Sequence, residues 1–396
     1  MTRFRSPHGW GVLALLLGIP GSAALATEYP VPTAPEQPVV SLPASAGAYA
    51  VGVRSFAWMD ESRSETGRPG EDGVREITAT AWYPTDAADD GQKARYFPTL
   101  ENILAGADQY PAEQQRYALM YEPLSDVATN SMPGAKPATI DDGWPVILFS
   151  PGGSVSSHAQ TALAERLAGN GYVFVAMSHP HSSFDFGPET GFSMSRAWDL
   201  DNKDRAIADA NDNELADILA ADASFVLERM RELQKTDHVL GRVMDLERVG
   251  IAGHSRGGKT VGRACSTNGE FKACVVLDNI GPARERTLGI KQPFLTLRAP
   301  WDEERVAELH DYLGRTRSVA YDLALSGSNH FSCSDLPIFI ADIRSEALAP
   351  VDGINACASI IQSFLDKYLK TELVSPTDWL PAKFSADVDM TVFSTN

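Results

Sequence analysis

The chain has 396 residues, of which 43% are hydrophobic, and a formal net charge of −18. This length suits one large domain with insertions. The negative charge disfavours nucleic acid and anionic membrane surfaces as partners, and we interpret it as a contribution to solubility rather than as a sign of a cationic substrate.

The first 26 residues have the features of a secretory signal peptide. Arg3 and Arg5 precede an apolar stretch from Trp10 to Ile19, and the sequence from Ala24 to Ala26 is a small-x-small cleavage signal. The apolar stretch is short for a membrane span, and no cysteine that could carry a lipid directly follows it. We therefore expect cleavage near Ala26, a secreted or periplasmic protein and no stable membrane anchor.

The next part of the chain lacks helical periodicity. Residues 27–47 are rich in Pro, Ala and Val, which predicts an extended N-terminal arm. Residues 48–57 and 75–83 alternate apolar and polar side chains, as strands do. Residues 86–143 are mostly polar and are expected to form a long insertion.

From residue 144 onward, short apolar runs alternate with helical stripes. Strands are expected at 145–150, 172–177, 249–252, 273–277, 294–297 and 319–325, and helices at 159–167, 215–233, 303–313 and 354–369. A second insertion, acidic and irregular, is expected at 182–213. This alternation predicts an α/β fold with a mainly parallel central sheet and helices on both faces. Residues 48–396 would form a single domain.

Residues 248–260 read RVGIAGHSRGGKT and match two motifs. In G-x-S-x-G, the nucleophile elbow, Ser255 stands on a strained turn between a strand and a helix. In G-x-x-x-x-G-K-[ST], the P-loop, Lys259 and Thr260 serve phosphate and magnesium. ATP is scarce outside the cytoplasm, so the signal peptide favours the elbow. A nucleotide-binding protein remains the alternative from a different functional class.

A serine hydroxyl is a weak nucleophile and needs a base, which histidine supplies near pH 7. His330 follows the last expected strand of the parallel sheet, where a Ser, Asp, His order would put it. An oxyanion hole needs two N–H groups directed at the developing charge. By position, these are the backbone amides of Arg256, directly after the nucleophile, and of Gly153, at the end of PGG.

Six ordered pieces carry a family resemblance. They are AWYP at 81–84, PVILFSPGG at 145–153, LAGNGYVFVAMSHPHSS at 167–183, GHSRGG at 253–258, VVLD at 275–278 and SNHFSCSD at 328–335. On these pieces the chain resembles the α/β-hydrolase superfamily and, more narrowly, the platelet-activating-factor acetylhydrolase and dienelactone-hydrolase-like group, over about residues 81–369. Pro151 stands where that group commonly has histidine.

The resemblance implies an esterase for short acyl groups, active in lipid degradation, that works through an acyl-enzyme without a cofactor or a metal. It also implies Asp278 as the acid of a Ser-His-Asp triad, because the group has its acid at the end of the strand after the nucleophile unit. Asp302, after the next strand, occupies the position more usual across the superfamily and remains the alternative acid; if unused in catalysis, it would cap a helix.

A histidine pair and a run of aspartates resemble metal sites, but we prefer simpler interpretations of both. The pair His179 and His181 resembles metal ligands, but a loop at the end of a strand is the preferred interpretation. An acidic run lacks the glycine and the glutamate of a calcium loop and is expected to be solvated. This run consists of Asp199, Asp201, Asp204, Asp209 and Asp212.

Four cysteines lie in the C-terminal half. An oxidising compartment favours disulfides, and four cysteines allow three pairings. We expect Cys265 to pair with Cys274 and Cys333 with Cys357, because each pair closes a short loop between consecutive elements. Buried free thiols are the alternative.

The sequence thus predicts an exported serine hydrolase that acts on a small-molecule carboxylic ester. An amidase or an acyltransferase would use the same residues. The oligomeric state is left open.

Overall fold

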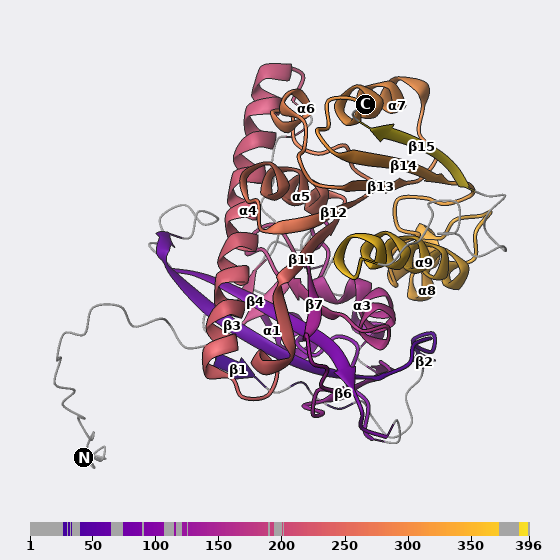
Figure 1. Cartoon of the computed structure of the whole chain (residues 1–396). Helices are drawn as coiled ribbons and strands as arrows, with labels where there is room; N and C mark the ends of the chain where they lie inside the picture. Colours follow the sequence, from indigo (N-terminus) through magenta and orange to yellow (C-terminus); the bar gives the residue numbers. More distant parts are fainter. Residues whose placement is uncertain are drawn as a thin grey trace, which may run out of the picture.

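The structure is a computed structural model, and it describes most of the chain after residue 26 (Figure 1). The described residues are 27–29, 31, 33, 40–64, 74–88, 91–106, 115, 121–124, 126–188, 191–193, 200, 202–371 and 388–394. The expected signal peptide, Asp199 and Asp201 lie outside them.

Strands of the described residues form one large sheet with the order β1-β3-β4-β8-β7-β11-β12-β13-β14-β15, and β6 pairs with β3. Its strands are β1 (Thr27–Tyr29), β3 (Ala50–Ser64), β4 (Val74–Thr85), β6 (Ser131–Pro133), β7 (Trp144–Ser150), β8 (Val173–Met177), β11 (Met244–His254), β12 (Phe271–Leu277), β13 (Phe294–Arg298), β14 (Val319–Leu325) and β15 (Val388–Ser394). The short strands β2 (Val40–Ser41), β5 (Val127–Ala128), β9 (Asp185–Gly187) and β10 (Gly191–Ser193) form two separate pairs.

The centre of the sheet, from β8 to β14, is parallel, and its strands are buried on both faces. The antiparallel strands β3 and β4 flank it at one edge and β15 at the other. This arrangement confirms the predicted α/β class with a mainly parallel sheet. Continuous apolar runs form these strands because neither face of a central parallel strand meets water.

Helices cover both faces (Figure 1). They are α1 (Leu100–Gly106), α3 (Thr161–Gly169), α4 (Arg205–Thr236), α5 (Arg256–Thr267), α6 (Glu285–Leu288), α7 (Glu303–Leu313), α8 (Leu336–Phe339) and α9 (Pro350–Leu369), with 3₁₀ turns at Glu122–Leu124, Ser157–Gln160, Gly241–Val243 and Ala341–Ile343. Helices α4, α5 and α7 share one buried apolar cluster with the sheet, and α3 and α9 share a second. A third, smaller cluster includes residues of α1 and α8.

One expected boundary needs correction. Helix α4 begins at Arg205, so the last part of the insertion expected at 182–213 is helical; the side chain of Asp204 starts the helix by accepting a hydrogen bond from Ala206 N at 3.0 Å. The first residues of the expected extended arm, Thr27–Tyr29, form strand β1, which pairs with β3. Strand β15 was missed, although its sequence alternates apolar and polar residues.

Both predicted disulfides are confirmed: Cys265 is bonded to Cys274, and Cys333 to Cys357. The first joins α5 to β12 and the second joins the loop after β14 to α9. None of the helices in the described part of the chain combines the length and the apolar character that crossing a bilayer requires.

Candidate active site

Ser255 stands on the sharp turn between β11 and α5. Its φ of 54° and ψ of −118° lie in a region that non-glycine residues rarely adopt. Two backbone hydrogen bonds hold the turn, one from Ser255 N to Leu277 O and one from Gly258 N to Ser255 O, each of 2.8 Å. A strained serine that the surrounding backbone holds in place is the expected geometry of a nucleophile elbow.

The glycines of the motif are required by close backbone contacts. A Cβ atom on Gly257 would lie 2.0 Å from Ser150 O, and a Cβ atom on Gly253 would lie 2.3 Å from Gly257 O. Neither position has room for a side chain. The turn therefore fits tightly against the end of β7, which leads into residues 151–153.

A carboxylate orients His330, which lies in the loop after β14. His330 Nδ1 is 2.5 Å from Asp278 Oδ2, and Asp278 directly follows β12. The other oxygen, Oδ1, accepts hydrogen bonds from Ala299 N and Trp301 Nε1, each of 2.9 Å. Burial raises the pKa of Asp278, but the hydrogen bonds from His330 and Ala299 outweigh it and hold the pKa below the ordinary value.

The alternative acid, Asp302, has a different position. Its side chain accepts a hydrogen bond of 2.8 Å from Arg305 N and caps the start of α7. It is therefore the helix cap that the sequence suggested for an unused acid, and of the two carboxylates it is Asp278 that meets His330.

His254 packs beneath His330, and their ring centroids are 4.7 Å apart. His254 Nε2 donates to His330 O at 2.7 Å, and burial lowers the pKa of His254 to about 4, so this ring is neutral at pH 7. In the described part of the chain Ser255 Oγ makes no hydrogen bond with His330. Hydrogen bonds of this kind often tighten only when substrate binds.

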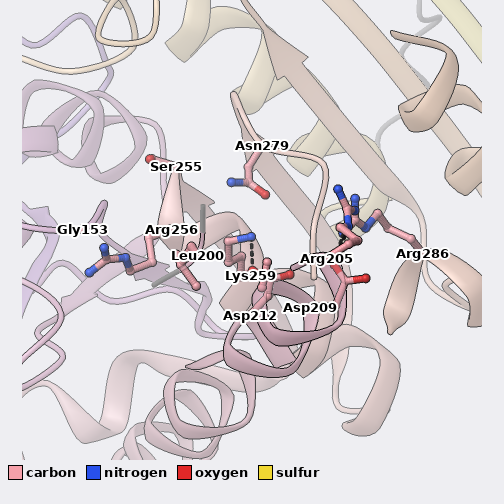
Figure 2. A pocket seen from close by; sticks show the side chains of 11 residues that line it. Gly153, Leu200, Arg205, Asp209, Asp212, Ser255, Arg256, Lys259, Asn279 and Arg286 are labelled. Carbon is pink, nitrogen blue, oxygen red and sulfur yellow. Dashed lines mark ion pairs between the residues drawn. The ribbon is translucent and has the colours of Figure 1, made fainter. Parts of the chain in front are cut away.

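Gly153 and Arg256, the expected oxyanion donors, lie beside each other. A Cβ atom on Gly153 would lie 2.4 Å from Arg256 Cζ, so the guanidinium covers the glycine. Figure 2 shows the side chain of Arg256 extending away from Ser255 toward Gly153. Arg256 Nη1 also donates to Ser182 O at 3.3 Å.

A pocket of about 380 Å³ opens beside Ser255 (Figure 2). It is lined by Gly153, Leu200, Arg205, Ala208, Asp209, Asp212, Ser255, Arg256, Lys259, Asn279 and Arg286. Lys259 forms an ion pair with Asp212, and Arg205 with Asp209 at 2.8 Å. The sequence did not single out Arg205, Asn279 or Arg286. Of these three, only Asn279 could have been found from the sequence, because it directly follows the candidate acid Asp278.

Similarity to known proteins identifies the family of the chain. The sequence matches the family described as platelet-activating factor acetylhydrolase, isoform II, over residues 35–191 and 221–374. The chain belongs to this acetylhydrolase family. A curated relative from Arthroderma benhamiae, named as a probable 1-alkyl-2-acetylglycerophosphocholine esterase, is 25% identical over 223 residues, which are 50% of each chain. The present chain thus spans about half the length of that relative.

A solved structure shares the fold of this acetylhydrolase family member. It is a ferulic acid esterase from Streptomyces cinnamoneus, with a TM-score of 0.72, 21% sequence identity, and coverage of 89% of the present chain and 99% of its own. At this identity the likeness establishes the α/β-hydrolase fold alone.

Family membership also favours one of the two motifs that share residues 253–260. Because the chain is an α/β-hydrolase of the acetylhydrolase family, we interpret this turn as a nucleophile elbow rather than as a phosphate loop. Lys259, the candidate phosphate ligand, lies inside α5 and pairs with Asp212. Asp212 is buried, so the prediction that this acidic run is solvated is wrong for this residue.

His179 lies in the loop that follows β8, as expected, and its side chain is buried there. Its Nε2 lies 2.7 Å from Ser150 Oγ and its Nδ1 lies 2.8 Å from Asp222 Oδ2. Both ring nitrogens have protein partners, which leaves neither free to bind a metal.

Proposed function

We propose that this protein is an exported carboxylic ester hydrolase with Ser255 as nucleophile, His330 as base and Asp278 as the acid. The contact of 2.5 Å between His330 Nδ1 and Asp278 Oδ2, on a loop beside the strained Ser255, carries the proposal. Membership of the acetylhydrolase family supports it.

The proposed reaction proceeds through an acyl-enzyme. Ser255 Oγ attacks the ester carbonyl while His330 Nε2 takes its proton. The ionised Asp278 keeps the proton of His330 on Nδ1 and stabilises the imidazolium that forms. The amides of Arg256 and Gly153 bind the developing oxyanion. His330 then protonates the leaving alcohol, and a water molecule, deprotonated by the same histidine, releases the acid.

The pocket beside Ser255 suits a compact, polar substrate. Its described lining includes the charged side chains of Arg205, Lys259 and Arg286, which disfavour a long apolar chain at this position. The relative named as an acetylglycerophosphocholine esterase supports a short acyl group. The two disulfides support export to an oxidising compartment.

The test of this function is Ser255→Ala. Because Ser255 is the proposed site of acylation, hydrolysis of nitrophenyl acetate should fall by about 10⁴-fold or more, and labelling by a fluorophosphonate probe should disappear. Ser266→Ala, on the far part of the same helix, is the matched control and should keep both. Turnover of Ser255→Ala at the wild-type rate would refute the assignment. With the wild-type enzyme, nitrophenyl esters of increasing acyl chain length would define the length of acyl group that the pocket accepts.

A further inference from the structure

A second Ser, His, Asp arrangement lies beneath the candidate active site. Ser150 Oγ is 2.7 Å from His179 Nε2, and His179 Nδ1 is 2.8 Å from Asp222 Oδ2. The exposed fractions of these three residues are 0%, 1% and 0%. Buried so completely, this group cannot touch a substrate, so its role must be exerted through the residues around it.

Arginines hold the buried carboxylate ionised. Arg75 donates to both oxygens of Asp222, from Nε at 2.8 Å and from Nη2 at 2.7 Å, and Arg63 Nη1 lies 2.8 Å from Oδ1. Burial raises the pKa of Asp222, but Arg75 outweighs this and the pKa falls well below the ordinary value. Burial lowers the pKa of His179, so a neutral ring donates from Nδ1 to the carboxylate at pH 7.

Ser150 connects this group to both parts of the candidate oxyanion hole. It is the last residue of β7 and directly precedes Pro151, Gly152 and Gly153. Its hydroxyl contacts Thr260 Oγ1 at 2.9 Å, and Thr260 lies on α5, just over one helical turn after Ser255. The hydroxyl therefore joins the start of the 151–153 loop to the helix that carries the candidate nucleophile.

His179 holds the same loop from the other side. Its carbonyl oxygen accepts hydrogen bonds from Ser182 N at 2.9 Å and Ser183 N at 2.8 Å, which fold the 179–183 turn. Ser182 O in turn accepts from Ser154 N at 2.8 Å and from Arg256 Nη1 at 3.3 Å. Residues 151–154 are thus tied to His179 at both ends.

We propose that Ser150 and His179 are positioning residues, which use the fixed charge of Asp222 to hold the 151–154 loop against α5 and so aim the Gly153 amide at the oxyanion. The catalytic part of this inference rests on the proposed function. Its physical basis is that small displacements of a preorganised donor are costly, since a shift of about 1 Å can cost on the order of 10²-fold in rate.

The first test is Ser150→Ala, with Ser55→Ala as the matched control. Ser55 is also fully buried, and its hydroxyl lies 3.0 Å from Thr80 Oγ1, within the β3 and β4 pair. Ser150→Ala should lower kcat for nitrophenyl acetate by about 10- to 100-fold, less than the loss of a whole donor, and change KM little. Affinity for a trifluoromethyl ketone, which imitates the oxyanion, should fall in parallel. Ser55→Ala should change neither.

A second variant addresses the histidine itself. His179→Asn keeps an amide group near the position of Nδ1, facing Asp222, and removes the atom that reaches Ser150. It should reproduce the kinetic effect of Ser150→Ala, and the double variant should be little worse than either single one. The pH dependence of kcat/KM should stay unchanged in all three, because the His330 and Asp278 pair is untouched.

Amide hydrogen exchange supplies a readout that needs no activity. Peptides covering residues 152–156 should exchange faster in Ser150→Ala and His179→Asn than in wild type or Ser55→Ala. Equal exchange and equal kcat in Ser150→Ala and Ser55→Ala would overturn the proposal. If wild-type protein hydrolysed no ester, the proposed function would fail, and unchanged exchange would then overturn the positioning role as well.

Discussion

Asp278 illustrates how much depends on the direction of one side chain. It leaves β12 with a φ of 53°, in the left-handed region, and this turn directs its carboxylate at His330. Asp302 follows the neighbouring strand at the same edge of the sheet but turns its carboxylate onto its own helix. Both acids have a plausible place in the sequence, and only the backbone conformation separates them.

Asp278→Asn tests this assignment. The amide cannot hold His330 in the same tautomer or stabilise an imidazolium, so kcat should fall by about 10⁴-fold while the fold is kept. Steady-state hydrolysis of nitrophenyl acetate measures the change.

Asp302→Ala is the matched control. It should retain kcat and lower the free energy of unfolding by about 1 kcal/mol, the usual effect of losing a helix cap. The reverse ranking of the two variants in kcat would identify Asp302 as the acid.

At the scale of elements, the catalytic candidates are held together by connections between strand ends. Three parallel strands, β7, β11 and β12, bring residues 151–153, Ser255 and Asp278 to one edge of the sheet. His330 lies on a loop, and the position of a loop residue needs restraints beyond those of the sheet. The Cys333–Cys357 disulfide supplies one, three residues after the histidine.

The two disulfides should therefore differ in effect. Replacing Cys333 and Cys357 by serine should lower both stability, by about 3 kcal/mol, and kcat, because the His330 loop is released from α9. Replacing Cys265 and Cys274 should lower stability by a similar amount and leave kcat near the wild-type value.

Urea unfolding and ester hydrolysis of the folded protein at one temperature measure both quantities. Equal values of kcat in the two double variants would show that the second disulfide has no part in positioning His330.

At the scale of the whole molecule, the core contains neutral histidines. Burial lowers the pKa of His158 and of His254 to about 4. Between about pH 4 and 6.5, the unfolded chain binds a proton at each of these residues and the folded chain does not. The free energy of unfolding is therefore highest above the pKa that these histidines have in the unfolded chain, and it decreases as the pH falls below that value.

Acid should destabilise the protein accordingly. Lowering the pH from 7 to 5 should cost about 2 kcal/mol for each of the two histidines, measured as the free energy of unfolding in urea. In His158→Phe the ring contacts with Trp82 and Phe97 can persist while one titrating group is removed, so the loss on acidification should be smaller by that amount. An unchanged pH dependence in this variant would contradict the assignment to His158.

The sequence by itself predicted the α/β class, the central strands and main helices, the two disulfide pairs, and Ser255 and His330 as the candidate nucleophile and base. These features depend on local patterns: apolar runs, glycines at close contacts and short spacings between cysteines. Hydrogen bonding across the fold decided the rest. It places the carboxylate of Asp278, and not that of Asp302, against His330. It also gives partners to the buried side chains of Asp212 and His179. It also joined Ser150 to His179 and Asp222, residues far apart in the chain, because buried polar groups take whatever partners the packed elements bring to them.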